Sequence, residues 1–453
     1  MKSLLSKAFP KRWRAAVLVL ILLGIPTTGN EKWQNKGGIR DRPRLQTVKA
    51  GLPEHRIRRR RAAPDEILVK FRESLDESSA RATLEAYRVR KIERISQLGV
   101  YHVQIPSQAG LEETISALVR NPDVTYAGKN PRIHLTASPN DEYFWRQYAL
   151  YNSGGQVEVP GSPQGKARAD IKATAAWEET KGDGGVIIAV LDTGLDMDHP
   201  DIKNKVVSKG RDFINDDDDA ADDHWHGTHV AGIAAAETNN NRGIAGVAWN
   251  CRILPVKIID KDGYGYGSEL IKGITWAVDN KANVINLSLG TEDDDPTIKA
   301  AVKYAYDKGV VVVASAGNDG SSVLYPAAYD QFCLAVAATD YLDNVTEWSN
   351  RGREIDVAAP GEMILSLMPT WYNGPNHPPY AFASGTSMAA PHVAGFAALL
   401  KSFKPWLSVA DIMNVIRFSA DDVNSAQKKG RDNDIGYGRI NMEKALVPLK
   451  IKS

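Results

Sequence analysis

The fold is decided by the run Val186-Ile-Ile-Ala-Val-Leu-Asp-Thr-Gly194, in which six apolar residues lead without a break into polar ones. An unbroken apolar run of this length is typical of a parallel strand that is covered on both faces. Similar runs follow at 253–259, 284–289, 310–314 and 333–337, and helical patterns lie at 227–237, 268–280 and 297–308. This alternation predicts an α/β fold with a doubly wound, mostly parallel sheet.

Polar residues of reactive types stand where these strands end or where helices begin. Asp192 directly follows the first apolar run, and Asn318 follows the run 310–314. His226 begins the helical pattern His226-Gly-Thr-His-Val-Ala-Gly232, and Ser387 opens another helix within residues 384–395. Each residue alone is more often a helix cap or a turn residue. Because sites form at the carboxyl ends of parallel strands, we expect these residues to converge.

Together, these four residues supply the groups that acyl transfer needs. A serine hydroxyl becomes a nucleophile when an imidazole takes its proton, a carboxylate orients that imidazole, and fixed donors stabilise the oxyanion. The order of acid, histidine and serine along the chain is that of one known convergent arrangement. The sequence by itself leaves open whether the base is His226 or His229, which lie three residues apart.

The segments that hold these residues resemble those of the subtilisin-like serine proteases, and in detail their thermitase-like branch. The resemblance covers about residues 139–447 and rests on four stretches: 192–194, 226–232, 316–318 and 384–395. We therefore expect a serine endopeptidase that acts on polypeptide substrates through an acyl-enzyme.

The resemblance also implies a role for each reactive residue. Ser387 is the nucleophile, His226 is the base, and Asp192 orients that base. The Asn318 side chain and the Ser387 backbone N–H form the oxyanion site. The remaining histidines of these segments are then packed residues, namely His224, His229 and His392.

Substrate-binding segments are implied by the same resemblance. Two stretches match those that hold an extended peptide by adding it to a sheet edge: Ser288-Leu289-Gly290 and Gly263-Tyr264-Gly265. An ordinary surface loop is the alternative for the second stretch. Leu324 stands where a glycine leaves the specificity pocket open in broad-pocket members, so we expect a shallow apolar pocket that prefers medium side chains.

Calcium is the cofactor that the resemblance implies, in a structural role. Its expected ligands are Asp141, Asp201, Thr238, Asn240, Arg242 and Ile244, which offer the hard oxygens that Ca²⁺ prefers. The acidic run 215–219, with Asp222 and Asp223, is a second candidate. For that run, a solvated acidic loop remains the alternative.

A separate small domain precedes the peptidase segments. Residues 65–137 have the order strand, helix, strand, strand, helix, strand, which predicts a ferredoxin-like α+β domain. The resemblance makes this domain an inhibitory propeptide, bound within its own chain and removed by self-cleavage. We expect the peptidase domain at 138–447 and a short tail at 448–453.

The first 64 residues hold 16 Lys and Arg against three acidic residues, so they carry +13 and the rest of the chain carries −12. A negative body argues against a nucleic-acid surface. Basic residues precede the apolar run 15–25, which predicts a signal peptide at 1–30 and a secreted protein. A membrane anchor is the alternative. Residues 31–64 form a basic linker, whose run 56–61 is a solvated tail, a cleavage site or an anionic-surface contact.

Two rival functions come from other classes. A catalytically silent binding protein would be expected to lack one of the four site residues, and this chain has all of them. A membrane-anchored processing protease that cuts after paired basic residues would need an acidic pocket pattern, which we do not find in the sequence. We expect a monomer. The two cysteines, Cys251 and Cys333, cannot form a disulfide framework.

Overall fold

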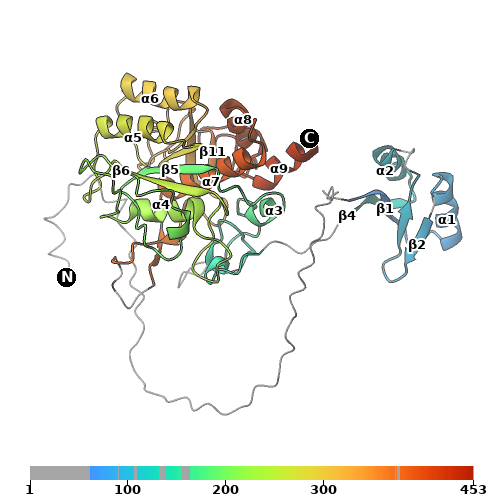
Figure 1. Cartoon of the computed structure of the whole chain (residues 1–453). Coiled ribbons are helices and arrows are strands. Elements are labelled where there is room, and N and C mark those ends of the chain that lie inside the picture. The colour runs from blue at the N-terminus through green and yellow to red at the C-terminus, as the bar shows by residue number, and fades with distance from the viewer. Residues whose placement is uncertain are drawn as a thin grey trace, which may run out of the picture. The chain divides into compact units, whose positions relative to one another are not determined.

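The computed structural model describes residues 62–89, 91–106, 110–131, 138–155, 164–372, 374 and 378–451. These residues belong to two compact units, one ending at 131 and the other beginning at 138 (Figure 1). The predicted signal peptide, residues 1–30, and most of the predicted linker, residues 31–64, lie outside the described residues.

The N-terminal unit has the predicted ferredoxin-like order. Its four strands form an antiparallel sheet in the order β2-β3-β1-β4, with α1 and α2 in the connections. Alternate residues of β1, such as Ile67 and Val69, are buried in its core. The elements are β1 (Ala62–Phe71), α1 (Glu77–Ala86), β2 (Lys91–Ile95), β3 (Val100–Gln104), α2 (Leu111–Val119) and β4 (Val124–Pro131). The first strand therefore begins three residues before the predicted domain start.

The second unit is built on a seven-stranded sheet in the order β11-β10-β9-β8-β5-β7-β6, and its strand pairs are parallel. This confirms the predicted α/β class. The strands are β5 (Ile187–Asp192), β6 (Arg211–Asp212), β7 (Arg252–Lys257), β8 (Val284–Leu287), β9 (Val311–Ser315), β10 (Cys333–Thr339) and β11 (Val357–Pro360). The chain leaves β5 toward β7 and later returns to β8 on the other side. The carboxyl end of β5 is therefore the switch point at which α/β sheets form their sites.

Helices cover both faces of this sheet (Figure 1). Ile188 and Val190 of β5 pack in the core with α4 and α7, whereas Ala189 and Leu191 pack in the core with α5 and α6. Burial on both faces explains why the strands have unbroken apolar sequences. The helices are α3 (Ala173–Trp177), α4 (His226–Ala235), α5 (Gly267–Asp279), α6 (Pro296–Asp307), α7 (Thr386–Phe403), α8 (Val409–Ser419) and α9 (Met442–Ile451).

Several short elements were not predicted from the sequence. A two-stranded hairpin, β12 (Ile364–Leu367) and β13 (Tyr380–Ala383), leads directly into α7. Single 3-10 turns lie at η2 (Phe144–Arg146) and η3 (Lys203–Lys205). Helix α9 runs to Ile451, so the predicted domain end at residue 447 falls inside a helix. Cys251 and Cys333 are buried and unbridged. Within the described part of the chain, none of the helices has both the length and the apolar character of a membrane span.

Candidate active site

The carboxylate of Asp192 lies at the end of the central strand and contacts one imidazole. Its Oδ1 is 2.7 Å from Nδ1 of His226, and it also accepts the Thr193 backbone N–H at 2.8 Å. Only 2% of the Asp192 side chain is exposed, compared with 20% for His226. Because Nδ1 is engaged by the carboxylate, the imidazole is oriented with Nε2 as the nitrogen available for proton transfer.

This contact decides between the two candidate histidines. Burial alone would lower the pKa of His226, but the charge and hydrogen bond of Asp192, together with the charge of Asp222, raise it above the usual value. Burial lowers the pKa of His229 to about 3 and that of His392 to about 4. These two side chains contact backbone carbonyls, of Ala381 and Met388. Of these three histidines, only His226 therefore combines an acidic partner with partial exposure.

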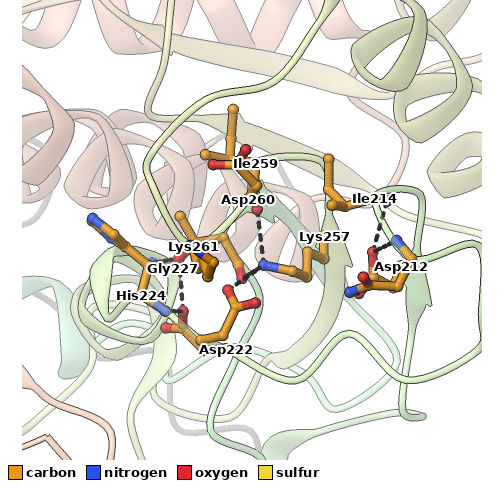
Figure 2. A network of polar contacts seen from close by, with 12 residues as sticks. Asp212, Ile214, Asp222, His224, Gly227, Lys257, Ile259, Asp260 and Lys261 are labelled. Atoms are coloured by element: carbon orange, nitrogen blue, oxygen red, sulfur yellow. Dashed lines mark hydrogen bonds and ion pairs between the residues drawn. The ribbon is translucent and has the colours of Figure 1, made fainter.

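His226 is held in place by a second buried carboxylate, that of Asp222. Its Oδ1 accepts the backbone N–H groups of His224 and Trp225 at 2.9 and 3.0 Å, and its Oδ2 accepts that of Thr228 at 3.0 Å. Asp222 thus satisfies N–H groups on both sides of His226, at the start of α4, where helices have unpaired donors. Figure 2 shows Asp222 and His224 beside Gly227, the second residue of this helix.

A buried ammonium joins the same region to the sheet. Nζ of Lys257 donates to the Thr193 and Ile259 carbonyls at 2.7 and 2.9 Å and to Asp223 at 2.6 Å. Figure 2 shows this side chain between the two strand ends. A fully buried lysine is costly unless it is paired, and here each contact fixes a segment that follows β5, precedes α4 or follows β7. The sequence feature that could have indicated this buried lysine is its position inside the apolar run 253–259.

Ser387 lies in the first turn of α7. Its Oγ donates to the Ser288 carbonyl at 3.1 Å, while Oγ of Ser288 donates to the Ser387 carbonyl at 2.9 Å. Proton transfer to His226 therefore requires the Ser387 hydroxyl to rotate away from Ser288. Such loose geometry is common in free enzymes and tightens when substrate binds.

The side-chain amide of Asn318 is fixed by Thr386, a residue that the sequence analysis did not single out. Oδ1 of Asn318 accepts both the backbone N–H and the hydroxyl of Thr386, at 2.8 and 2.9 Å. The Thr386 hydroxyl accepts the Gly317 N–H at 3.1 Å. With Oδ1 engaged, the NH₂ group of Asn318 is the part available to an oxyanion beside Ser387. The sequence feature that could have indicated this role is the position of Thr386 directly before the expected nucleophile, Ser387.

Comparison with known proteins identifies the family to which this arrangement belongs. A model described as the subtilase family matches residues 183–438, which hold all four of these residues. The chain belongs to the subtilase family. A model of the fervidolysin N-terminal prodomain matches residues 54–130, so this subtilase is made with a prodomain. That match begins within the basic segment that the sequence analysis assigned to a linker.

Similar proteins agree with this assignment. The thermophilic serine proteinase of Bacillus sp. (strain AK1) is 42% identical over 387 residues, which cover 84% of this chain and 87% of that protein. Thermitase of Thermoactinomyces vulgaris is 42% identical over 311 residues, covering 68% and 99%. A solved protease structure from Pseudoalteromonas arctica PAMC 21717 aligns with a TM-score of 0.60 at 31% identity, covering 69% of this chain and 99% of that one. The subtilase is therefore a serine endopeptidase, as the sequence predicts.

The expected substrate segments end up beside strand ends. Gly265 approaches the sheet closely, since a Cβ atom there would lie 2.2 Å from the Ile258 carbonyl oxygen. Leu324 lies between Gly290, in the expected substrate segment 288–290, and Gly317, which follows β9. A Cβ atom at Gly290 would come within 2.7 Å of Leu324 Cβ, and one at Gly317 within 2.9 Å of its Cδ1. Leu324 thus fills space between two chain segments, one of which is the expected substrate segment 288–290.

The expected calcium residues meet at one loop. Both carboxylate oxygens of Asp141 accept the Asn239 N–H at 2.9 Å. Asp201 accepts the Asn240 side-chain amide at 2.7 Å and the Ile244 N–H at 3.0 Å. In the same loop, Thr238 donates its hydroxyl to the Ala236 carbonyl, and the Arg242 N–H donates to the Asn240 side chain.

The acidic run is not one cation cluster in this structure. Its charges are distributed among partners from other segments, because Asp222 caps α4 and Asp223 pairs with Lys257. Three of the four acids at 216–219 pair with basic neighbours: Asp216 and Asp218 with Arg211, and Asp219 with Lys209. Among the described residues, no three His, Cys, Asp or Glu side chains gather as a metal-binding group. The solvated-loop alternative therefore fits residues 216–219 better.

Asp222→Asn should shift the acid limb of the pH profile of kcat/KM to lower pH. Protonated His226 cannot accept the serine proton, so activity falls as the pH drops through the pKa of His226. Since the charge of Asp222 helps to raise that pKa, its removal lowers it. We also expect a loss of about tenfold or more at the optimum, because the start of α4 loses its fixed geometry.

The control for this measurement is Asp219→Asn, which neutralises a half-exposed carboxylate of the same loop. It should leave the acid limb and the optimum unchanged. An acid limb that stays in place in Asp222→Asn would show that Asp222 does not act on His226 through its charge.

Proposed function

We propose that Asp192, His226, Ser387 and Asn318 carry out the hydrolysis of peptide bonds by this subtilase. Oγ of Ser387 attacks the peptide carbonyl carbon while Nε2 of His226 takes its proton. Asp192 holds the imidazole and stabilises its charged form. The Asn318 NH₂ group and the Ser387 N–H donate to the oxyanion. The 2.7 Å contact of Asp192 with His226 is the observation that carries this proposal.

The second half of the reaction uses the same groups. His226 gives its proton to the leaving amine, which departs and leaves an acyl-enzyme on Ser387. Water then attacks the acyl carbon with His226 again as the base, and Ser387 recovers its proton. The strand ends supply the binding of an extended polypeptide, for which residues 288–290 and 263–265 are the proposed edges.

We propose that the prodomain inhibits the peptidase and is removed by self-cleavage between about Ile133 and Asn140. Residues 133–137 of this segment lie outside the described residues, whereas residues 138–140 are described. The support is its position in the chain, at the junction between a prodomain and a peptidase domain. We further propose that the basic and apolar residues of 1–30 direct secretion. That the enzyme is a monomer stays a prediction.

Ser387→Ala should accumulate as the uncleaved proform and should not hydrolyse casein, because both reactions need the same nucleophile. N-terminal sequencing and a protease assay of the secreted protein measure the two effects. Ser384→Ala, which changes a serine three residues earlier, should mature and stay active. Full maturation of Ser387→Ala without added protease would contradict self-processing.

We propose that one Ca²⁺ ion binds between Asp141, Asp201 and the loop 238–244. Burial raises the pKa of Asp201 to about 7 and also raises that of Asp141. Among the described residues, neither carboxylate forms an ion pair, so their charges need another partner. The donor set fits Ca²⁺, since carboxylates, the Asn240 amide oxygen and the backbone carbonyls of Thr238, Arg242 and Ile244 are hard oxygens. The ion would neutralise the two buried charges and tie the start of the domain to this loop.

Chelation should therefore lower the melting temperature of the mature enzyme. An ion that binds only the folded state at 100 times its Kd adds about 2.7 kcal/mol, which is roughly 4 °C for the domain predicted at 138–447. Asp201→Asn should abolish the chelator effect. Asp218→Asn, in the exposed acidic run, should retain it. A chelator effect that survives Asp201→Asn and disappears in Asp218→Asn would move the ion to the acidic run.

We propose that Leu324 makes the specificity pocket shallow, which favours Leu, Met or Ala before the cleaved bond over Trp. Its contacts with Gly290 and Gly317 support this role, because the side chain occupies space at the pocket walls. Leu324→Gly should raise kcat/KM for Phe and Trp by about tenfold, since one or two methylenes in such a pocket are worth about 1–3 kcal/mol. A peptide-library profile measures this. A wild-type optimum at Phe or Trp would contradict the assignment.

A further inference from the structure

Trp225, the residue before His226, has a backbone conformation that L residues rarely adopt. Its φ is 135°, a value that glycine reaches without strain and that strains a bulky residue. The backbone is held on both sides, because the Trp225 N–H donates to Asp222 and its carbonyl accepts the His229 N–H. A tryptophan in a position suited to glycine suggests that its side chain has a use that outweighs the strain.

The Trp225 ring is the centre of an aromatic row along the site. His224 stacks on it with ring centroids 5.5 Å apart, and His226 meets its edge at 5.6 Å. Beyond it lies Tyr372 at 6.4 Å, whose ring is 5.9 Å from that of Trp371. The row therefore connects the catalytic imidazole with a tryptophan that is 52% exposed.

Tyr372 and Trp371, at the far end of this row, lie in the connection between β12 and β13, the hairpin that precedes Ser387. Strand β12 packs against α4, and β13 ends four residues before Ser387. Thr370 anchors the start of the connecting segment, since its N–H and hydroxyl both donate to Asp196, at 2.7 and 2.8 Å. The exposed ring of Trp371 is thus attached to a fixed point close to the site.

The contacts of His224 and Trp225 with the neighbouring segments indicate which part of a substrate the aromatic row faces. At one end, a Cβ atom on Gly263 would lie 3.9 Å from Nε2 of His224, so the row starts at a segment proposed to bind the extended peptide. It continues past His226, which protonates the leaving amine. The residues that follow the cleaved bond begin at that amine, so they start beside the imidazole that the Trp225 ring contacts.

We propose that Trp225, Tyr372 and Trp371 form a subsite for an apolar or aromatic substrate side chain on the leaving-group side of the cleaved bond. This subsite rests on the proposed serine-protease mechanism and extends the same cleft. Its occupant is one of the first three residues after the bond. Contact between aromatic rings adds binding beyond simple burial, which suits aromatic over small residues there.

Quenched peptides with identical residues before the cleaved bond test this proposal. One set places Phe at the first, second or third position after the bond, a reference peptide has Gly at all three, and a p-nitroanilide has none of these residues. The wild-type enzyme should prefer Phe over Gly at one position by about fivefold or more in kcat/KM. The ratio of kcat/KM for the Phe peptide to that for the Gly peptide should fall toward one in Trp371→Ala and in Trp225→Gly. Glycine is used at position 225 because it suits the backbone conformation there.

Trp406→Ala is the matched control, since it removes another exposed tryptophan, 72% exposed, from the segment between α7 and α8. It should keep both the preference and the p-nitroanilide activity. The subsite is overturned if the wild-type enzyme shows no preference, if the preference survives in both variants, or if both variants lose the p-nitroanilide activity in the same proportion. Cleavage of the p-nitroanilide by Ser387→Ala would instead overturn the mechanism.

Discussion

Asp192 places a carboxylate where almost no solvent reaches it, at the end of the central strand, and there it meets an imidazole nitrogen at 2.7 Å. A buried carboxylate is costly unless hydrogen bonds and a polarisable partner compensate. The surrounding structure provides this compensation at Oδ1, whereas Oδ2 is buried and has no hydrogen-bond partner among the described residues. The Thr193 N–H donates to the same carboxylate, and burial on both faces of β5 fixes the position of the strand end. The orientation of His226 therefore depends on how rigidly the strand and α4 are joined.

Contacts of Asp222 and Lys257 hold the end of β5 and the start of α4 together. Asp222 binds backbone N–H groups on both sides of His226, and Lys257 fastens the segments after β5 and β7 to Asp223. Burial alone would lower the pKa of His226, but the charge and hydrogen bond of Asp192 raise it and the charge of Asp222 adds to them. Asp222 therefore affects both the position of His226 and its proton affinity. The strained backbone of Trp225 lies within this network, which explains how the conformation persists.

The parallel strands were predictable because burial on both faces leaves unbroken apolar runs, and the proposed catalytic residues could be named because they follow such runs or open helices. Spacing could not separate His226 from His229, since both belong to one helix start and only the contact with Asp192 distinguishes them. For the acidic run, the sequence could not decide between a cation site and a solvated loop, because the partners of its charges, Arg211, Lys209 and Lys257, come from other segments. Strands of two to four residues, such as β6 and β12, have too little sequence to show periodicity.

Covalent labelling of the mature enzyme with diisopropyl fluorophosphate tests the central claim most directly, because the reagent reacts with a serine only where a base takes its proton. Mass spectrometry of the digested protein should find one adduct, on Ser387. The labelling rate should fall by about 10³-fold or more in His226→Ala whose prodomain has been removed by an added protease, and should change little in Ser384→Ala. An adduct on another residue, or a rate that His226→Ala leaves unchanged, would contradict the account.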